Sequence, residues 1–257
     1  MAEPDSPEKT DLEGSIVLIT GGARRIGETI ARHLHGHGAR LLVHYHTNAE
    51  NAQRMQWQLN AIRPDSVEII QGDFRDIAQF KIDLRHAIHR LGRLDCLINN
   101  ASRFYPTPIS STGDEQWNDL IGTNLMAPFF LSQATAPYLK INHGSIINIA
   151  DIYAQRPLPE YSVYSASKAG LVSLTRSLAW ELGPEIRVNA IAPGAILWPD
   201  HDIDEIARQR IVSKTALKQV GNPSDIAKAA LFLMTSADYI TGQILNVDGG
   251  RSILFGS

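Results

Sequence analysis

Short apolar runs, rich in β-branched residues, alternate along the chain with longer segments whose apolar residues recur at helical spacing. The short runs predict strands, and the longer segments predict helices. The predicted strands are Ser15–Thr20, Ala39–Tyr45, Ser66–Gln71, Leu94–Asn99, Ser145–Ala150, Ile186–Ile191 and Gln243–Val247. Because strands and helices alternate, the sequence predicts an α/β fold: a doubly wound, Rossmann-type domain with a seven-stranded parallel sheet and helices on both faces.

The predicted helices connect these strands. One begins near Arg24, and another follows the fifth strand and carries Tyr164 and Lys168. The remaining three are Asn48–Ile62, Asp76–Leu91 and Asp114–Lys140.

Two segments show neither periodicity: Ser102–Thr112, and a stretch from Pro193 to about Thr215. Ligand-binding loops are often drawn from such segments. No internal repeat or linker divides the chain, so residues 15–257 are predicted to form a single domain. Residues 1–14 are polar and acidic, which predicts a flexible lead-in rather than a signal peptide.

Composition narrows the class of protein. Of the 257 residues, 44% are hydrophobic and 20% charged, which is ordinary for a globular protein. The net charge of −3 and the lack of a block rich in Lys and Arg argue against nucleic-acid binding. No apolar run reaches the roughly 18–20 residues that span a bilayer. The single Cys96 lies in a predicted strand, which favours a buried thiol over a nucleophile. We therefore expect a cytoplasmic protein that binds neither nucleic acid nor membranes.

Glycines and polar residues stand where the predicted strands end. They are Thr20-Gly21, Tyr45-His46, Gly72-Asp73, Asn99-Asn100-Ala101, Asp151 and Pro193-Gly194. In doubly wound sheets ligands bind beyond the carboxyl ends of the strands, so these stretches are expected to share one site. After the first strand a glycine turn leads into a helix, an arrangement that places a phosphate on backbone N–H groups. The sequence therefore predicts a dinucleotide site at this edge.

Tyr164 and Lys168 are four residues apart on a predicted helix and therefore share one of its faces. An ammonium beside a phenol favours the phenolate and is expected to lower the pKa of the tyrosine. Such a donor suits the reduction of a C=O or C=N bond, in which a proton arrives as a hydride does. The alternative is a surface Tyr and Lys one turn apart, because this spacing alone occurs often by chance.

Together these motifs resemble those of the short-chain dehydrogenase/reductase family. Four stretches match its T-G-x-x-x-G-x-G, N-N-A-G, Y-x-x-x-K and P-G motifs: Thr20–Gly27, Asn99–Ala101, Tyr164–Lys168 and Pro193-Gly194. The resemblance implies that Tyr164 supplies a proton, that Lys168 holds the nicotinamide ribose, and that Asn124 helps to organise the lysine and a water relay.

Three departures from the family pattern are informative. Arg25 stands in place of the second motif glycine, Ser102 in place of the glycine after N-N-A, and Asp151 in place of a serine thirteen residues before the tyrosine. The pteridine reductases of this family share all three departures. In them, a phenylalanine at the position of Phe104 stacks on the pterin, and the second strand ends much as Val43–His46 does here. The chain is therefore similar to pteridine reductases; dihydromonapterin reductases, which share the Asp-Tyr-Lys set, remain an alternative.

Asp151 decides the expected substrate class. An ionised carboxylate cannot donate a hydrogen bond to a carbonyl oxygen, as the usual serine does. It can share a proton network with Tyr164 and water, and so deliver a proton to a ring nitrogen, as the reduction of a pterin requires. The alternative is an aspartate that only caps a turn.

The end of the second strand indicates the cofactor. NAD-selective sites usually place an acidic residue there to hold the ribose hydroxyls, whereas this chain has Tyr45–Asn48 and no acid before Glu50. Donors without a carboxylate suit a 2′-phosphate, so NADPH is predicted, although Thr47 stands where pteridine reductases often have arginine. Arg24 and Arg25 lie near the positive end of a predicted helix, which also favours an anionic ligand.

The resemblance implies two overlapping sets of contacts. The cofactor is expected to contact Gly21, Arg24, Arg25, Ile26, Tyr45, His46, Thr47, Asn48, Asp73, Phe74, Asn100, Ala101, Ser102, Tyr164, Lys168, Pro193 and Gly194. The substrate is expected to contact Arg25, Ser102, Phe104, Asp151 and Tyr164. Asp73 either caps the helix that begins near Asp76 or accepts from the adenine amino group, and the resemblance favours adenine. No metal site is predicted, because His44 and His46 lack nearby Cys or carboxylate partners in the sequence.

The favoured function is NADPH-dependent reduction of a pterin, such as dihydrobiopterin, dihydrofolate or dihydromonapterin, to its tetrahydro form. A reductase of 3-oxoacyl groups or sugar ketones would use the same Tyr and Lys, but Asp151 and Phe104 argue against it. An alternative of another class is a non-catalytic dinucleotide sensor. A sensor does not need the proton relay that Asn124, Tyr164 and Lys168 imply.

The predicted helix Asp114–Lys140 carries more apolar surface than one face of a sheet readily covers. Its apolar residues include Leu120, Ile121, Leu125, Met126, Phe129, Phe130 and Leu131. In the family this helix and the one with Tyr164 pair across a two-fold axis. A homotetramer is therefore expected, with a dimer as the alternative.

Overall fold

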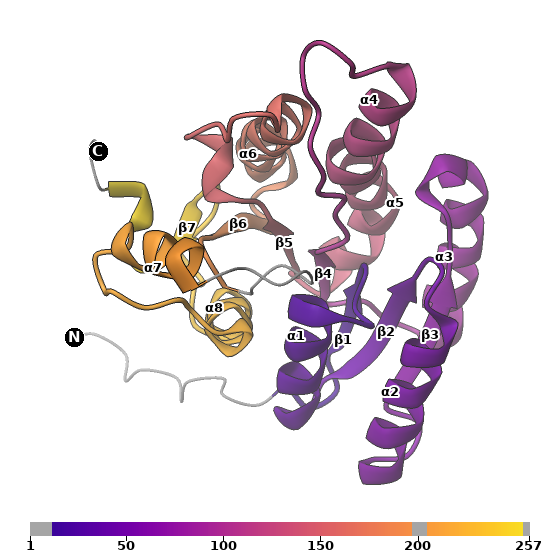
Figure 1. Cartoon of the computed structure of the whole chain (residues 1–257). Coiled ribbons are helices and arrows are strands. Elements are labelled where there is room, and N and C mark those ends of the chain that lie inside the picture. The colour runs from indigo at the N-terminus through magenta and orange to yellow at the C-terminus, as the bar shows by residue number, and fades with distance from the viewer. Residues whose placement is uncertain (1–11, 197–204, 254–257) are drawn as a thin grey trace.

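The central sheet has seven parallel strands in the order β3-β2-β1-β4-β5-β6-β7 (Figure 1). The computed structural model describes residues 12–196 and 205–253. The strands are β1 Ile16–Ile19, β2 Arg40–Tyr45, β3 Val67–Gln71, β4 Cys96–Asn99, β5 Ser145–Ile149, β6 Arg187–Pro193 and β7 Ile244–Val247. The α/β class and the seven-stranded parallel sheet predicted from the sequence are confirmed.

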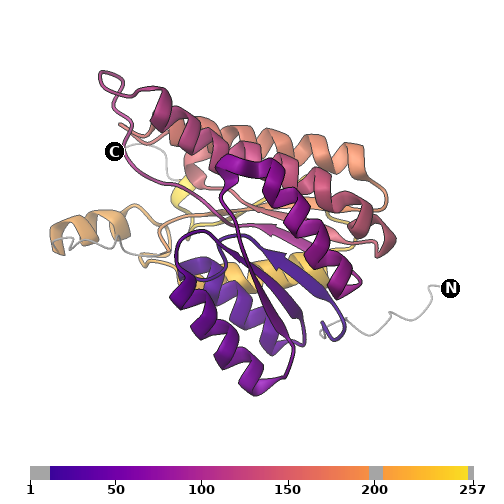
Figure 2. The ribbon, with the colours of Figure 1, turned by 90° about the vertical axis from the view of Figure 1, so that its right-hand side faces the viewer.

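Helices cover both faces of the sheet (Figure 2). The helices longer than one turn are α1 Arg25–Gly36, α2 Ala49–Ile62, α3 Ile77–Leu91, α4 Asp114–Ile121, α5 Ala127–Ile141, α6 Ser162–Leu182, α7 Glu205–Ser213 and α8 Pro223–Thr235. From β1, Val17 and Ile19 pack with α1, α2 and α8, whereas Ile16 and Leu18 pack with α3, α5 and α6. All four residues of β1 are buried, as expected for a parallel strand covered on both sides.

Side-chain caps set where two of the predicted helices begin. Asn48 accepts a hydrogen bond from the Asn51 N–H at the start of α2, and Asp76 accepts one from the Gln79 N–H at the start of α3. Each cap satisfies an N–H group that has no partner within its helix. The predicted starts of these helices are confirmed to within one residue.

The predicted helix Asp114–Lys140 is interrupted. After α4 comes a π-helical segment, η2 Gly122–Met126, and only then α5. The π segment lies so close to α6 that a Cβ added at Gly170 would come within 2.7 Å of a Leu125 methyl group. A larger residue at position 170 would therefore force Leu125 to move. Single π turns within α-helices are frequent at functional sites.

The stretch from Pro193 to about Thr215 contains a helix, α7, so the prediction that it is irregular is wrong there. This helix is short, and Ile206 in it is 63% exposed, so apolar periodicity gives little sign of it. Residues 197–204 lie outside the described residues. The other irregular segment, Ser102–Thr112, has no helix, as predicted; its Thr107 bridges to Tyr161.

Residues 1–11 of the predicted lead-in lie outside the described residues. Leu12 belongs to the folded part, because it is 5% exposed and its N–H donates to the His37 carbonyl. Within the described ranges, no helix combines the length and the apolar character that crossing a membrane requires.

A buried chain of polar groups links β4, β5 and α6 beneath the sheet edge. Asn99 Nδ2 donates to Asn148 Oδ1 at 2.8 Å, and Asn148 Nδ2 donates to Thr175 Oγ1 at 2.9 Å. Buried polar groups that lose a partner are costly, so this chain fixes the relative positions of the three elements. Asn100 and Asp151, which follow β4 and β5, are positioned by it.

Candidate active site

Residues that follow β4 hold the loop after β1. Asn100 Nδ2 donates to the carbonyls of Thr20 and Gly21, and Thr20 Oγ1 accepts from the N–H groups of Asn100 and Ala101 at 2.9 and 3.0 Å. A Cβ at Gly27, in the first turn of α1, would lie 2.4 Å from the Gly21 carbonyl oxygen, so only glycine permits this approach. The loop and the helix N-terminus together form a cradle suited to a phosphate.

The backbone at Arg25 explains why its position commonly holds glycine. Its φ of 51° lies in the left-handed region, which glycine adopts without strain. Arg24 is the N-cap residue of α1, so both arginines lie at the positive end of the helix, as predicted. Residues in such a strained backbone conformation are found mostly at functional sites.

His44 joins three strand ends, although the sequence did not indicate it as a site residue. Its Nδ1 accepts from the Gly21 N–H at 3.2 Å, and its Nε2 donates to the Gly72 carbonyl at 3.1 Å. The ring stacks on buried Phe74, with centroids 4.5 Å apart. Burial lowers the pKa of His44 to about 4, so the ring stays neutral, as an accepting Nδ1 requires.

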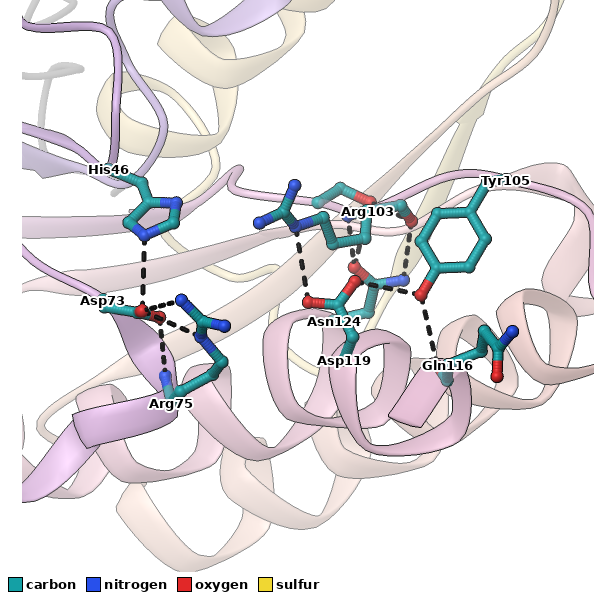
Figure 3. A network of polar contacts seen from close by, with 9 residues as sticks. His46, Asp73, Arg75, Arg103, Tyr105, Gln116, Asp119 and Asn124 are labelled. Carbon is teal, nitrogen blue, oxygen red and sulfur yellow. Dashed lines mark hydrogen bonds and ion pairs between the residues drawn. The ribbon is translucent and has the colours of Figure 1, made fainter. Parts of the chain in front are cut away.

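At the ends of β2 and β3, the Asp73 carboxylate contacts the side chains of His46 and Arg75 (Figure 3). Its Oδ2 lies 3.3 Å from His46 Nε2 and 2.6 Å from Arg75 Nη2. Its Oδ1 accepts from the Arg75 N–H, so Asp73 caps the 3₁₀ turn η1 Phe74–Asp76. The hydrogen bond from the Arg75 side chain holds the pKa of Asp73 at about 2. The capping role is observed, and contact with adenine stays a prediction.

The other predicted cofactor residues lie along the same edge. Thr47 is exposed, and Ile26 is half-buried against the core of α1. Tyr45 ends β2, and Pro193 ends β6, where the N–H of Gly194 continues the ladder to β7.

Asp151 and Tyr164 meet where β5 ends and α6 begins. The Tyr164 hydroxyl donates to Asp151 Oδ2 at 2.7 Å. Asp151 Oδ1 accepts from the Tyr153 N–H at 2.8 Å, so the carboxylate also caps the 3₁₀ turn η3 Ile152–Ala154. The capping role considered for Asp151 is therefore observed, and its carboxylate also accepts a hydrogen bond from the phenol; its part in a proton relay stays a prediction.

The predicted lowering of the Tyr164 pKa is wrong. Burial and the adjacent Asp151 carboxylate raise the pKa of Tyr164 well above its ordinary value. Lys168 Nζ donates to the Ile149 carbonyl at 2.8 Å and lies 5.8 Å from the centroid of the Tyr164 ring. Burial lowers the pKa of Lys168 to about 8, and burial raises the pKa of Asp151. Tyr164 is therefore a neutral hydrogen-bond donor, because the charge closest to its hydroxyl is negative.

Asn124, in the π segment, clamps the loop that follows β4 (Figure 3). Its Oδ1 accepts from the Arg103 N–H at 2.8 Å and from Ser102 Oγ at 3.1 Å. Its Nδ2 donates to the Arg103 carbonyl and to Ser167 Oγ, at 3.0 and 3.1 Å. Asn124 thus reaches α6 through Ser167, the neighbour of Lys168. Its part in a water relay stays a prediction.

Two side chains of the same loop bind Asp119 on α4 (Figure 3). Arg103 Nε lies 3.5 Å from Asp119 Oδ1, and the Tyr105 hydroxyl donates to Asp119 Oδ2 at 2.9 Å. Burial and the Asp119 carboxylate raise the pKa of Tyr105 to about 12, so the phenol keeps its proton. Sequence reasoning missed these residues, because only the fold brings the loop against α4.

Aromatic rings surround the Asp151–Tyr164 pair. Phe104 stacks on Tyr161 with centroids 4.6 Å apart, and it meets the Tyr164 ring edge-on at 4.8 Å. Phe104 is nevertheless 53% exposed. Packing within the protein is therefore observed, and the residue as a whole is still exposed enough to contact a ligand.

The described residues contain no group of three or more His, Cys, Asp or Glu side chains placed to hold a metal ion. The site instead combines a glycine loop and helix N-terminus after β1 with the hydrogen-bonded Asp151–Tyr164 pair. Such an arrangement could serve a hydride-transfer reaction on a dinucleotide.

The neutral, buried His44 predicts a specific pH dependence of stability. Its pKa is about 4 in the folded protein and 6.5 in the unfolded chain, so only the unfolded chain gains a proton as the pH falls between these values. The free energy of unfolding should fall by about 3 kcal/mol over this range from His44 alone. We expect urea unfolding of His44→Gln to lack this component. Equal pH slopes for the two proteins would contradict the assignment.

Known proteins resemble the chain over nearly its whole length. The family model described as Enoyl-(Acyl carrier protein) reductase matches residues 21–252. Pteridine reductase 1 of Leishmania tarentolae is 34% identical over 93% of this chain and 96% of its own. The putative ketoacyl reductase 2 of the granaticin polyketide synthase of Streptomyces violaceoruber is 32% identical, over 94% and 98%. The 3-oxoacyl-[acyl-carrier-protein] reductase FabG of Thermotoga maritima is 33% identical, over 94% and 99%. The chain therefore belongs to the short-chain dehydrogenase/reductase family, whose reductases are oxidoreductases that use nicotinamide cofactors.

Proposed function

We propose that the protein uses NADPH to reduce a dihydropterin to its tetrahydro form. The observation that carries the proposal is the 2.7 Å hydrogen bond between the Tyr164 hydroxyl and Asp151 Oδ2. A carboxylate at this position would repel the oxyanion that forms when a ketone is reduced. It suits a reaction in which a proton must reach a ring nitrogen.

The chain's own residues account for the proton. Burial raises the pKa of Asp151, so this carboxylate takes up a proton more readily than an exposed one would, and Tyr164 stays neutral. When the Tyr164 proton passes to the substrate nitrogen, Asp151 can pass a proton from water to the phenolate along their shared hydrogen bond. The buried ammonium of Lys168 lies near the same ring and favours the transient phenolate. Bound NADPH would supply the hydride.

The residues at the β1 and β2 ends fit such a cofactor. The loop after β1 is preformed, and a Cβ at Gly27 would close the space beside it. Arg24 and Arg25 stand at the positive end of α1 for the phosphates. His46 offers a donor to a 2′-phosphate where an NAD-selective site would have an acid. The nearby Asp73 carboxylate is paired with Arg75, which reduces its repulsion of the phosphate.

Phe104 supports the substrate assignment. It is more than half exposed and lies edge-on against the ring of Tyr164, which supplies the proton. A flat heterocycle that stacks on Phe104 would have its ring nitrogens beside the Asp151–Tyr164 pair.

Reduction of a 3-oxoacyl thioester is the second candidate, because two of the similar proteins carry ketoacyl reductase names at 32% and 33% identity. A non-catalytic dinucleotide sensor would not need the Asp151–Tyr164–Lys168 cluster.

A substrate panel tests the proposal. NADPH oxidation, followed by its absorbance, should be rapid with dihydrobiopterin or dihydrofolate and slow with an acetoacetyl thioester. NADPH should bind more tightly than NADH by about tenfold or more, equivalent to about 1.4 kcal/mol. Rapid turnover of the thioester alone would favour the second candidate, and equal affinity for the two cofactors would contradict the assignment of His46.

Two substitutions separate the roles of Asp151 and Tyr164. Tyr164→Phe removes the donor and preserves the packing, so turnover should fall sharply while NADPH affinity stays nearly unchanged. Asp151→Ser should lower pterin turnover by about 10²-fold or more, the usual contribution of a general acid. A serine variant that is less stable but keeps full turnover per folded molecule would show that Asp151 is only a cap.

The proposal includes assembly as a homotetramer. Phe129 on α5 is 40% exposed and Trp180 on α6 is 89% exposed, which leaves apolar surface on both helices. Sedimentation velocity at micromolar concentration should show a species of four chains, each of 28.3 kDa. A monomer under these conditions would exclude this assembly.

A further inference from the structure

The turn after β7 carries a cation toward the Asp151–Tyr164 pair. Asp248 Oδ1 accepts from the Gly250 N–H at 2.9 Å, and its Oδ2 accepts from the Ser252 N–H at 2.7 Å. The N–H of Arg251, between them, donates to the Asp248 carbonyl at 3.1 Å. The Asp248 carboxylate is thus engaged by backbone groups, and the turn holds Arg251 in place.

The Arg251 guanidinium lies beside the wall of the site. Its Nη2 donates to the Tyr153 hydroxyl in a long hydrogen bond of 3.4 Å. Tyr153 in turn donates its backbone N–H to Asp151 Oδ1 at 2.8 Å. The positive charge of Arg251 acts on Asp151 and on Tyr153, in both cases lowering a pKa that burial raises.

Most of the Arg251 guanidinium donors are not used by the described part of the chain. Arg251 is half-buried, and within the described part of the chain its side chain forms no ion pair and one hydrogen bond, to Tyr153. An arginine has five N–H donors in a planar fork that matches a carboxylate or a phosphate. A half-buried guanidinium with free donors is therefore suited to bind an oxyanion.

The topology separates this cation from the proposed phosphate cradle. The cradle lies after β1, whereas Arg251 follows β7, the strand at the far edge of the sheet beyond β4, β5 and β6. Arg251 is also not placed to bind the reacting ring. Tyr153 lies between its guanidinium and Asp151, so the cation is one side chain further out than the groups that hold the proton.

We propose that Arg251 binds an oxyanion on the side chain of the pterin substrate, and so selects pterins with a carboxylate- or phosphate-bearing substituent over uncharged ones. This assignment rests on the proposed reduction of pterins. The reacting ring would lie between Phe104 and Tyr164, and its substituent would extend past Tyr153 to the guanidinium.

The test compares three substrates with NADPH: dihydrobiopterin, which has no anion, dihydrofolate, which has carboxylates, and a dihydroneopterin phosphate. In Arg251→Gln the KM of the anionic substrate that Arg251 binds should rise about tenfold or more, the usual effect of losing a hydrogen bond to a charged group. Its kcat and the KM of dihydrobiopterin should change by less than about twofold. The anionic substrate whose KM rises more identifies whether Arg251 binds a carboxylate or a phosphate. Arg251→Lys keeps the positive charge but lacks the planar fork, so its KM for that anionic substrate should lie between the values of the unmodified protein and of Arg251→Gln.

Arg85→Gln on α3 is the matched control, because it removes an exposed arginine from another face and should change none of these values. If kcat/KM fell equally for all three substrates in Arg251→Gln and the pH profile of kcat shifted, Arg251 would act through Asp151, and the inference would be overturned. Unchanged KM values in Arg251→Gln would overturn it as well. If the unmodified protein turned over none of the pterins, the proposed function itself would fail, and this inference with it.

Discussion

Every neighbouring pair of strands in the sheet is parallel, and this constraint places the site. Parallel strands all point the same way, so the residues that follow them meet at one edge even when they are far apart in the sequence. Asn100 reaches Thr20 and Gly21 across about eighty positions, and Tyr153 meets Arg251 across 98. The buried chain from Asn99 through Asn148 then prevents the strand ends from shifting against one another.

At this edge the protein separates two electrostatic tasks. On the side of β1, β2 and β3, Arg24 and Arg25 lie at the positive end of α1, and Asp73 is paired to Arg75. On the side of β5, β6 and β7, burial brings the pKa values of Asp151 and Lys168 closer to neutrality. A group with a pKa near the working pH is an effective proton donor or acceptor.

Much of this arrangement could be predicted from the sequence, because apolar periodicity reports which residues must be buried. The seven strands follow from apolar runs, and the starts of α2 and α3 follow from the capping residues Asn48 and Asp76. Most residues of the candidate site could be proposed from the sequence because they stand directly after a predicted strand. Arg251 also follows a strand, but the role proposed for it depends on the direction of its side chain, about which the sequence carries no signal.

The failures have physical causes. The π turn at Gly122–Met126 adds one residue to a turn without disturbing the apolar pattern, so periodicity could not show it. The pKa of Tyr164 was predicted from its spacing to Lys168. The Lys168 ammonium instead donates to the Ile149 carbonyl, and the Tyr164 hydroxyl donates to the Asp151 carboxylate. His44 was missed because a strand pattern tells which face a side chain occupies and not what it will bind.

The loop after β1 is held from two sides: Asn100 binds its carbonyls, and His44 accepts the N–H of Gly21. Ordering one flexible residue costs about 1–2 kcal/mol in conformational entropy. Here this loss of entropy occurs when the chain folds, so it would not reduce the free energy of binding of a ligand at the loop. Because the Gly21 N–H already donates to His44 Nδ1, it is not available to a phosphate. The N–H groups that donate to a phosphate would have to come from residues beyond Gly21.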